Sequence, residues 1–313
     1  MQQAEGLLKQ LGEHLQAEDG SHAYLLLDPM MHDPLGCEML LAESCEAIRI
    51  DVRRPGLLAE QCPKLIQLRP QAVAVLRTSI ESALSEQQYV QQEATDGFAV
   101  GAWLLSSSSH DKVSRHLENV MCLPQPGSGR RYFRWADRRV MEWMWPELTD
   151  AQCASLLGPI HSWTSIDRRG ELTFRNGADM KEERSNEVVP PLRLTAAQWN
   201  HAGRCEVGQH LLRGWRRFSS SLPADYLPRA INAVSSVASL GVKGMQDTVL
   251  LGAYVLQVHP RLCDHPRLQE LVAGAQSGGM ELSRALEGVH DPEGWNAMRD
   301  ELERSPVFNL QAE

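Results

Sequence analysis

The sequence predicts an α+β protein in two parts: an N-terminal α/β lobe with a mixed β-sheet, followed by an all-α C-terminal lobe. Three observations support this prediction. The chain has 313 residues, of which 42% are hydrophobic, so it can form two cores of ordinary domain size. Short apolar runs alternate with amphipathic segments in the N-terminal half, which is typical of stacked strands and helices. From residue 195 onward only helical periodicities are convincing.

The first elements of the N-terminal lobe follow from hydrophobic spacing. Leucines three and four residues apart predict a helix over residues 2–16. The run AYLLLD, residues 23–28, is continuously apolar up to its aspartate, as in a strand that is buried on both faces. Further strands are predicted over residues 47–52, 64–69 and 98–106. Amphipathic helices are predicted over residues 72–88 and 110–121.

An unusual stretch follows, RRYFRWADRRVMEWMWPEL, residues 130–148. It contains five arginines and five of the chain's 18 aromatic residues. Alternation over residues 131–135 predicts a strand, and Asp137 is well placed to cap the next helix. Thr149 and Gln152 form a capping box for a short helix, and residues 160–176 are typical of a hairpin.

Composition then marks a division of the chain. Residues 177–194 are highly charged and end in two prolines, which indicates a linker. We therefore assign residues 1–176 to the α/β lobe and residues 195–313 to the helical lobe. Thr195 and Gln198 form a second capping box where the helical lobe begins.

Bulk properties exclude several classes of protein. The net charge of −9 gives no overall attraction to nucleic acid or to an anionic membrane. Seven cysteines without a C-x-x-C pair do not form the pattern of a disulfide framework. The N-terminus lacks a secretory signal, and the longest apolar run, residues 249–256, is far shorter than the roughly 20 residues of a membrane span. We expect a soluble, cytoplasmic protein.

Two groups of residues have metal-ligand chemistry. Asp28, His32 and Asp33 lie within six residues of one another, but a strand end followed by a proline-punctuated turn explains them more simply. His259, Cys263 and His265 surround two prolines without a C-x-x-C partner. We expect no metal site and no cofactor.

One catalytic hypothesis concerns His110 and Lys112, which resemble the H-x-K motif of phosphodiesterases of the phospholipase D type. That motif expects an aspartate five residues after the lysine, where this chain has Leu117. A helix start explains the segment better, so we expect the protein not to be an enzyme.

The arginine- and aromatic-rich stretch has two interpretations. Arginines bind phosphates and exposed aromatics stack on bases, so a nucleic-acid-binding regulator is the alternative function. The aromatic residues also have core-compatible spacings, and tryptophan and arginine are enriched at protein interfaces, which favours a structural or protein-docking role without nucleic acid. Trp143 and Trp145 cannot face the same side of one helix, so at least one needs a second burial surface.

Five segments, in order over residues 22–165, together resemble type VI secretion effector adaptors of the Tap, TEC and VasW kind. The segments are YLLLD, CPKLIQL, WLLSS with the later His116-Leu117 pair, RWADRRVM and LLGPIHSW. DHPRLQELV in the helical lobe fits more loosely. Two departures are Arg138, where the family usually has proline, and Ala136, where it has an aromatic residue.

The resemblance implies a non-enzymatic adaptor that binds a toxic effector, possibly one with a PAAR or Rhs element, and helps load it onto the VgrG spike. Such a chaperone needs exposed apolar surface. We expect effector-binding residues at Arg131, Trp135, Arg138, Trp143, Trp145, Trp199 and Trp215. We expect structural roles for Asp28, Arg134, Asp137 and Arg139.

Overall fold

The computed structural model describes residues 2–16, 20–52, 54, 56–177, 190–219 and 221–305. The chain divides into two compact units, Met1–Gly203 and Arg204–Glu313. Residues 195–203, which their sequence pattern assigned to the helical lobe, fall in the first unit. Most of the expected linker, residues 178–189, lies outside the described residues.

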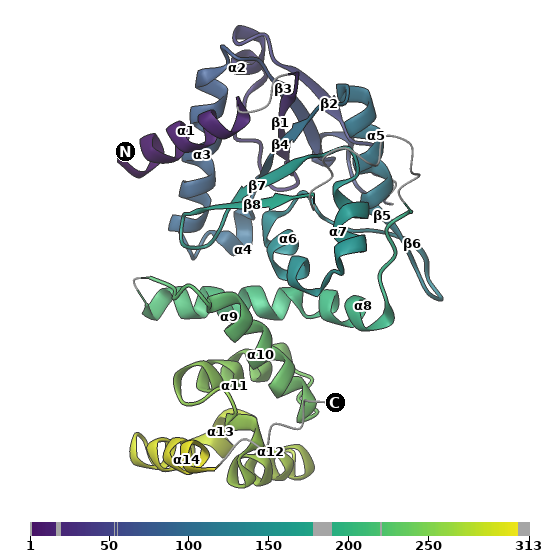
Figure 1. Ribbon diagram of the computed structural model, residues 1–313. Coiled ribbons are helices and arrows are strands. Elements are labelled where there is room, and N and C mark those ends of the chain that lie inside the picture. The colour runs from purple at the N-terminus through teal and green to yellow at the C-terminus, as the bar shows by residue number, and fades with distance from the viewer. Residues whose placement is uncertain are drawn as a thin grey trace. The chain divides into compact units, whose positions relative to one another are not determined.

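The first unit is built on a six-stranded sheet with the order β2-β3-β1-β4-β7-β8 (Figure 1). Its strands are β1 (His22–Leu27), β2 (Glu46–Arg49), β3 (Lys64–Leu68), β4 (Val100–Ser106), β7 (Ser162–Ile166) and β8 (Leu172–Asn176). The α+β class predicted from the sequence is confirmed. The expectation of a mixed sheet is wrong, because all five pairings of neighbouring strands in this sheet are antiparallel.

Helices cover both faces of this sheet, which explains its continuously apolar strands. The helices of the first unit are α1 (Gln2–Leu15), α2 (Cys37–Ala42), α3 (Val73–Gln88), α4 (Glu93–Asp96), α5 (His110–Met121), α6 (Arg138–Met144), α7 (Asp150–Leu157) and α8 (Ala196–Gly203), with 3-10 turns η1 (Ala59–Gln61) and η2 (Trp145–Glu147). On one face, Leu11 of α1 and Ile80 of α3 pack with Leu25 and Trp103 of the sheet. On the other, the ring of Tyr24 lies 5.4 Å from that of His110 in α5.

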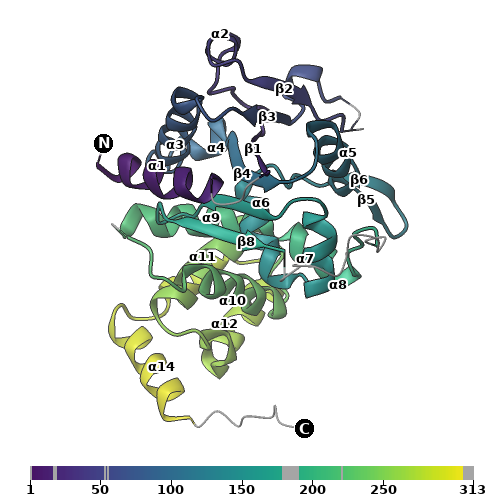
Figure 2. The same ribbon diagram turned by 45° about the horizontal axis from the view of Figure 1, so that its top comes forward.

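A two-stranded hairpin stands apart from the main sheet. It pairs β5 (Cys122–Gln125) with β6 (Gly129–Tyr132) and extends away from the rest of the first unit in both views (Figures 1 and 2). The predicted strand over residues 131–135 is therefore shorter than expected, and it ends at Tyr132.

The chain then crosses the central strand β4 before it enters α6. A side chain at Gly101 of β4 would collide with the backbone oxygen of Ala136, so glycine permits this close approach. The crossing places the N-terminus of α6 against the sheet.

The second unit contains only helices among its described residues, as predicted. They are α9 (Cys205–Phe218), α10 (Tyr226–Ser239), α11 (Met245–Gln257), α12 (Pro266–Gly278), α13 (Leu282–Glu287) and α14 (Glu293–Arg304), with a 3-10 turn η3 (Leu262–Asp264). Leu251 of α11 and Leu212 of α9 are fully buried, and Tyr254 stacks on Trp295 of α14 at 4.3 Å. Among the described residues of the whole chain, no helix combines the length and the apolar character needed to span a membrane.

Candidate functional site

A cluster of buried charges surrounds the ring of Phe98 in the first unit. The guanidinium carbons of Arg138, Arg139 and Arg168 lie 4.0, 4.9 and 5.6 Å from the centre of this ring. Cation–π attraction is stronger when the cation is removed from water, as it is here. We call this group, together with the carboxylates of Glu86, Glu93 and Asp137 that pair with the arginines, the Phe98 cluster.

Arg138 connects α6 to α3 and to the sheet. Its Nη1 donates to Glu86 Oε2 and to the backbone oxygen of Val100, each at 2.6 Å, and its Nη2 donates to the backbone oxygen of Ala83 at 2.6 Å. The side chains of Arg138 and Glu86 are 3% and 5% exposed. Because both charges are out of water, removing either partner would leave the other buried and uncompensated.

Glu93 of α4 holds the other two arginines. Arg168, which lies in the turn between β7 and β8, forms a two-pronged pair with Glu93 at 2.9 and 2.7 Å. Arg139 approaches Glu93 Oε1 at 3.4 Å. Two-pronged pairs fix geometry as well as charge, so Glu93 positions the β7–β8 turn relative to α6.

Asp137 is the N-cap of α6, the position predicted for it. Its Oδ1 accepts hydrogen bonds from the backbone N–H of Arg139 at 3.0 Å and from Arg139 Nε at 2.9 Å. Burial alone would raise the pKa of Asp137, but Arg139, Arg134 and these hydrogen bonds outweigh it and lower the pKa to about 2. Asp137 is therefore charged at neutral pH despite being buried.

Asp28 also pairs with Arg134, but its pKa shifts in the opposite direction from that of Asp137. Arg134 Nε donates to Asp28 Oδ2 at 2.9 Å, which ties the residue after β1 to the segment before α6. Burial raises the pKa of Asp28, and the attraction of Arg134 only partly opposes this effect. Arg134 thus pairs with both Asp28 and Asp137, and Asp137 also pairs with Arg139, so the four side chains form a continuous series of contacts within the fold.

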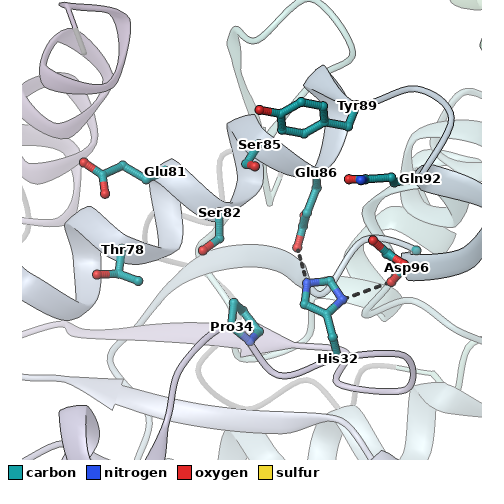
Figure 3. Close-up of a pocket in the computed structure, with 11 residues that line it drawn as sticks. His32, Pro34, Thr78, Glu81, Ser82, Ser85, Glu86, Tyr89, Gln92 and Asp96 are labelled. Carbon is teal, nitrogen blue, oxygen red and sulfur yellow. Dashed lines mark hydrogen bonds and ion pairs between the residues drawn. The ribbon is translucent and has the colours of Figure 1, made fainter.

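A pocket of about 410 Å³ opens next to Glu86 of the Phe98 cluster (Figure 3). We call it the His32 pocket; its walls come from the loop after β1, from α3 and from the α4 region, and they include Pro34, Ser82, Tyr89 and Asp96. His32 Nδ1 lies 3.0 Å from the backbone oxygen of Asp96, and His32 Nε2 lies 3.6 Å from Glu86 Oε1 (Figure 3).

The side chains that line the His32 pocket suit it to binding a polar group. Glu86 Oε1 accepts backbone hydrogen bonds from Ala99 at 2.8 Å and Val100 at 3.2 Å, and Glu86 Oε2 accepts from Arg138. The buried carboxylate is thus fully engaged by the fold. Among the described residues, His32 contacts a backbone oxygen and this carboxylate instead of a hydroxyl or thiol that it could activate.

The expected effector-binding residues do not form one surface. Trp135 is 0%, Trp143 1% and Arg138 3% exposed, so these three side chains do not lie at the surface, where an effector-binding residue has to lie. Trp135 lies in the core and donates from its indole nitrogen to the backbone oxygen of Val120 at 3.1 Å. Buried indoles are found where their N–H has such a partner.

Trp143 binds the chain's own helix α8, and Trp199 is part of that helix. The indole nitrogen of Trp143 donates to the backbone oxygen of His201 at 3.1 Å, and His201 Nε2 lies 3.0 Å from the backbone oxygen of Trp143. The two rings stack at 5.0 Å. Trp199, which is half-buried, meets Phe133 edge to face at 5.5 Å. The second burial surface that the sequence required for Trp143 is therefore α8.

The two predicted capping boxes strengthen the same contact. Gln152 caps α7 through Thr149, and Gln198 caps α8 through Thr195. The two glutamine side chains also hydrogen-bond each other, with Gln198 Nε2 lying 2.8 Å from Gln152 Oε1. The helix starts are thereby joined, which explains why α8 belongs to the first unit.

The remaining expected contact residues are dispersed. Trp145 is half-buried and its ring lies 5.7 Å from the guanidinium carbon of Arg175 in β8. Arg131 is exposed on the β5–β6 hairpin. Trp215 is half-buried on α9 in the second unit. Of the five arginines in residues 130–148, only Arg130 and Arg131 are exposed.

A family model matches part of the chain. Residues 23–155 match DUF4123, a domain of unknown function. No curated protein and no solved structure matches the chain. The DUF4123 segment runs from β1 into α7 and contains every member of the Phe98 cluster except Arg168. It also contains all the residues that line the His32 pocket.

No sequence motif marked Glu86, Glu93, Phe98 or Arg168 as a site residue. One local signal was available inside the DUF4123 segment, because Glu86 lies three residues after Ala83, which is buried on the inner face of α3. A carboxylate on that face needs a cation, and the five arginines of residues 130–148 were candidates. Arg168 lies outside the DUF4123 segment and carried no such signal.

The metal-ligand candidates are engaged in other contacts. Within the DUF4123 segment, Asp28 pairs with Arg134, and Asp33 Oδ2 pairs with Lys64 at 2.6 Å. In the second unit, His265 caps α12 by accepting from the backbone N–H of Arg267 at 3.2 Å, and its Nε2 lies 3.0 Å from Glu301. Across the described residues, no group of three or more His, Cys, Asp or Glu side chains is arranged to hold a metal ion.

Proposed function

We propose that the protein is a non-enzymatic type VI secretion adaptor that binds a cognate toxic effector in the cytoplasm and helps load it onto the VgrG spike. The observation that carries the proposal is the DUF4123 match over residues 23–155. It coincides with the span, residues 22–165, in which five segments resemble such adaptors in the same order. The DUF4123 match and the resemblance therefore fall on the same region of the chain.

The contacts of the first unit suit a binding protein. The Phe98 cluster and the α8 contacts hold helices from four parts of the chain around one sheet, which gives a fixed framework for surface recognition. The effector would then meet exposed residues, because Trp135, Trp143 and Arg138 are covered by the chain itself.

The surroundings of His110 support a role without catalysis. Its Nε2 lies 3.0 Å from the backbone oxygen of Leu65, and the residue is 9% exposed. His116, the other histidine of α5, has its Nε2 2.8 Å from the backbone oxygen of Leu156. A histidine nucleophile for phosphoryl transfer needs to face a substrate, and neither imidazole is oriented by a second catalytic group among the described residues.

The nucleic-acid alternative loses its main support. It requires the arginines of residues 130–148 to contact phosphates, whereas Arg134, Arg138 and Arg139 pair with carboxylates of the fold. Replacing them would weaken the fold before it weakened any binding. Arg130 and Arg131 alone make a small basic surface on an acidic protein.

Co-expression with the toxin encoded beside this protein's gene tests the proposal. We expect the toxin to accumulate only when the adaptor is present, and the two chains to elute together in size-exclusion chromatography. Adding the spike protein should give a ternary complex. A toxin encoded beside an unrelated spike serves as the control and should not bind. Toxin levels that do not depend on this chain, with no stable complex, would refute the adaptor function.

A further inference from the structure

The apolar face of α9 continues beyond the part of the helix that is covered. Leu211, Trp215 and Phe218 lie four and three residues apart, so they follow one stripe along the helix. Leu211 is 1% exposed, Trp215 is half-buried, and Phe218 is 86% exposed. Phe218 has the highest exposure of the large hydrophobic residues that the structure describes. The stripe thus begins in the core of the second unit and ends in solvent.

The same end of α9 is basic. Residues 207–224 contain Arg213, Arg216 and Arg217 and no aspartate or glutamate, although the whole chain has a net charge of −9. Arg213 and Arg216 have other contacts. Arg217 is exposed, and no ion pair joins it to another described residue.

The usual role of basic residues at a helix end accounts for only part of this arrangement. Cations in the last turn stabilise a helix by interacting with its dipole, which is a sufficient reason for Arg216 and Arg217. It gives no reason for a phenylalanine that is almost entirely in water. An exposed aromatic residue beside arginines has the composition of an interface hot spot.

We propose that the α9 end, residues 213–218, is a docking surface for an acidic protein segment that carries an apolar anchor side chain. The anchor would extend the Leu211–Trp215–Phe218 stripe by covering Phe218, and the carboxylates of the segment would face Arg217. This surface can serve such a partner whether or not the chain is a secretion adaptor.

Charge distribution favours an acidic peptide over nucleic acid. The residues of the second unit sum to 11 Lys and Arg against 13 Asp and Glu, a net charge of −2, so the basic end of α9 is a local feature. A polyanion with a charge on every nucleotide would be repelled by the remaining surface. A short acidic segment places its few charges within about one Debye length, roughly 8–10 Å, of Arg217.

A binding titration with the full chain tests this proposal. The probe is a fluorescein-labelled peptide in which glutamates alternate with leucines and phenylalanines. Its binding is followed by fluorescence anisotropy. Two companion peptides replace the glutamates by glutamine or the apolar residues by serine. We expect saturable binding of the probe, weaker binding at higher salt, and loss of binding for both companions.

Variants of the chain locate the surface. Phe218→Ala should weaken binding about tenfold, and Arg217→Glu should weaken it by at least as much and reduce its salt dependence. Both residues are exposed, so both variants should keep the circular dichroism spectrum of the parent chain. Met280→Ala and Arg267→Glu change an exposed apolar and an exposed basic residue elsewhere in the second unit, and they should bind the probe normally.

Four results would overturn the proposal. They are the absence of saturable binding, equal losses in the control variants, tighter Phe218-dependent binding of single-stranded DNA or anionic vesicles than of the peptide, and Phe218-dependent self-association in sedimentation velocity. The last two would assign the surface to a polyanion or to a second copy of the chain.

Discussion

The two compact units place their charged side chains differently. In the first unit, Arg138–Glu86 and Arg168–Glu93 join side chains that are all at most 5% exposed. The ion pairs described in the second unit each have at least one exposed partner, as in Arg229–Asp225 with 52% and 54% exposure. The second unit is held mainly by apolar contacts such as those of Leu251. We infer that ionisation controls the stability of the first unit far more than that of the second.

The largest effect should come from breaking the Phe98 cluster. Arg138→Met leaves Glu86 buried without its cation, and we expect a loss of about 3–5 kcal/mol in the free energy of unfolding. Urea unfolding followed by tryptophan fluorescence is the measurement, because the fully buried Trp103, Trp135, Trp143 and Trp163 all lie in the first unit.

Two further variants make this test specific. Arg229→Met breaks an exposed pair and should cost less than about 1 kcal/mol. Adding Glu86→Gln to Arg138→Met should recover part of the loss, since the uncompensated charge is then removed. An Arg138→Met chain as stable as the parent would show that the buried pair is dispensable.

A core substitution in the second unit gives the apolar counterpart. Leu251 is 0% exposed, so Leu251→Ala should cost about 3 kcal/mol through lost burial and an incompletely filled cavity. Hydrogen exchange measured by mass spectrometry should show the loss of protection in α10 and α11. Because no charge is involved, the acid sensitivity of the first unit should remain that of the parent chain; a change in it would contradict the separation of the two units.

Acid titration probes Asp137, whose pKa of about 2 lies below the ordinary value of 3.8. A depressed folded-state pKa stabilises the fold above the unfolded value, and this stabilisation is lost as the pH falls from about 4 to 2. The shift corresponds to about 2 kcal/mol. We expect Asp137→Asn to be less stable than the parent at neutral pH and to lose less stability in acid.

Asp28 is the matched control for that experiment. Its pKa is raised, so its contribution to the pH dependence has the opposite sign, and protonation favours the folded chain. Asp28→Asn should therefore leave the acid-induced loss due to Asp137 in place. Urea unfolding at a series of pH values distinguishes the two variants. If the free energy of unfolding changed equally with pH in both variants, the acid sensitivity could not be assigned to Asp137.

The smallest effect should come from the glutamine pair that joins α7 to α8. Gln152→Ala removes a cap and the hydrogen bond to Gln198, which should cost about 1 kcal/mol. The double variant with Gln198→Ala should cost less than the sum of the single changes, because the two side chains share a bond. Gln88→Ala, an exposed change on α3, should have no measurable effect on unfolding. If the cost of the double variant equalled the sum of the two single costs, Gln152 and Gln198 would not be energetically coupled.

The sequence predicted the local features of this fold well. The helix over residues 110–121 is α5, and the caps Asp137, Thr149 and Thr195 stand where they were expected. These features depend on neighbours within four residues. Strand direction was not predictable in this way: continuously apolar strands indicate burial on both faces, and here an antiparallel sheet has helices on both sides.

The roles of the arginines and tryptophans could not be predicted from spacing alone. Arg138 pairs with Glu86, 52 residues away, and Trp143 binds His201, 58 residues away. A helix pattern indicates that such side chains need a partner but does not say whether the partner is another protein or a distant part of the same chain. Here the chain supplies both partners.

Arg138 also has a consequence for how related chains can diverge. It occupies the first position of α6, directly after the N-cap, where a helix tolerates proline at no cost in backbone hydrogen bonds. The resembling adaptors usually have proline at that site. A chain with proline there cannot neutralise a carboxylate at position 86, so substitutions at positions 86 and 138 should be inherited together, with an uncharged residue accompanying the proline.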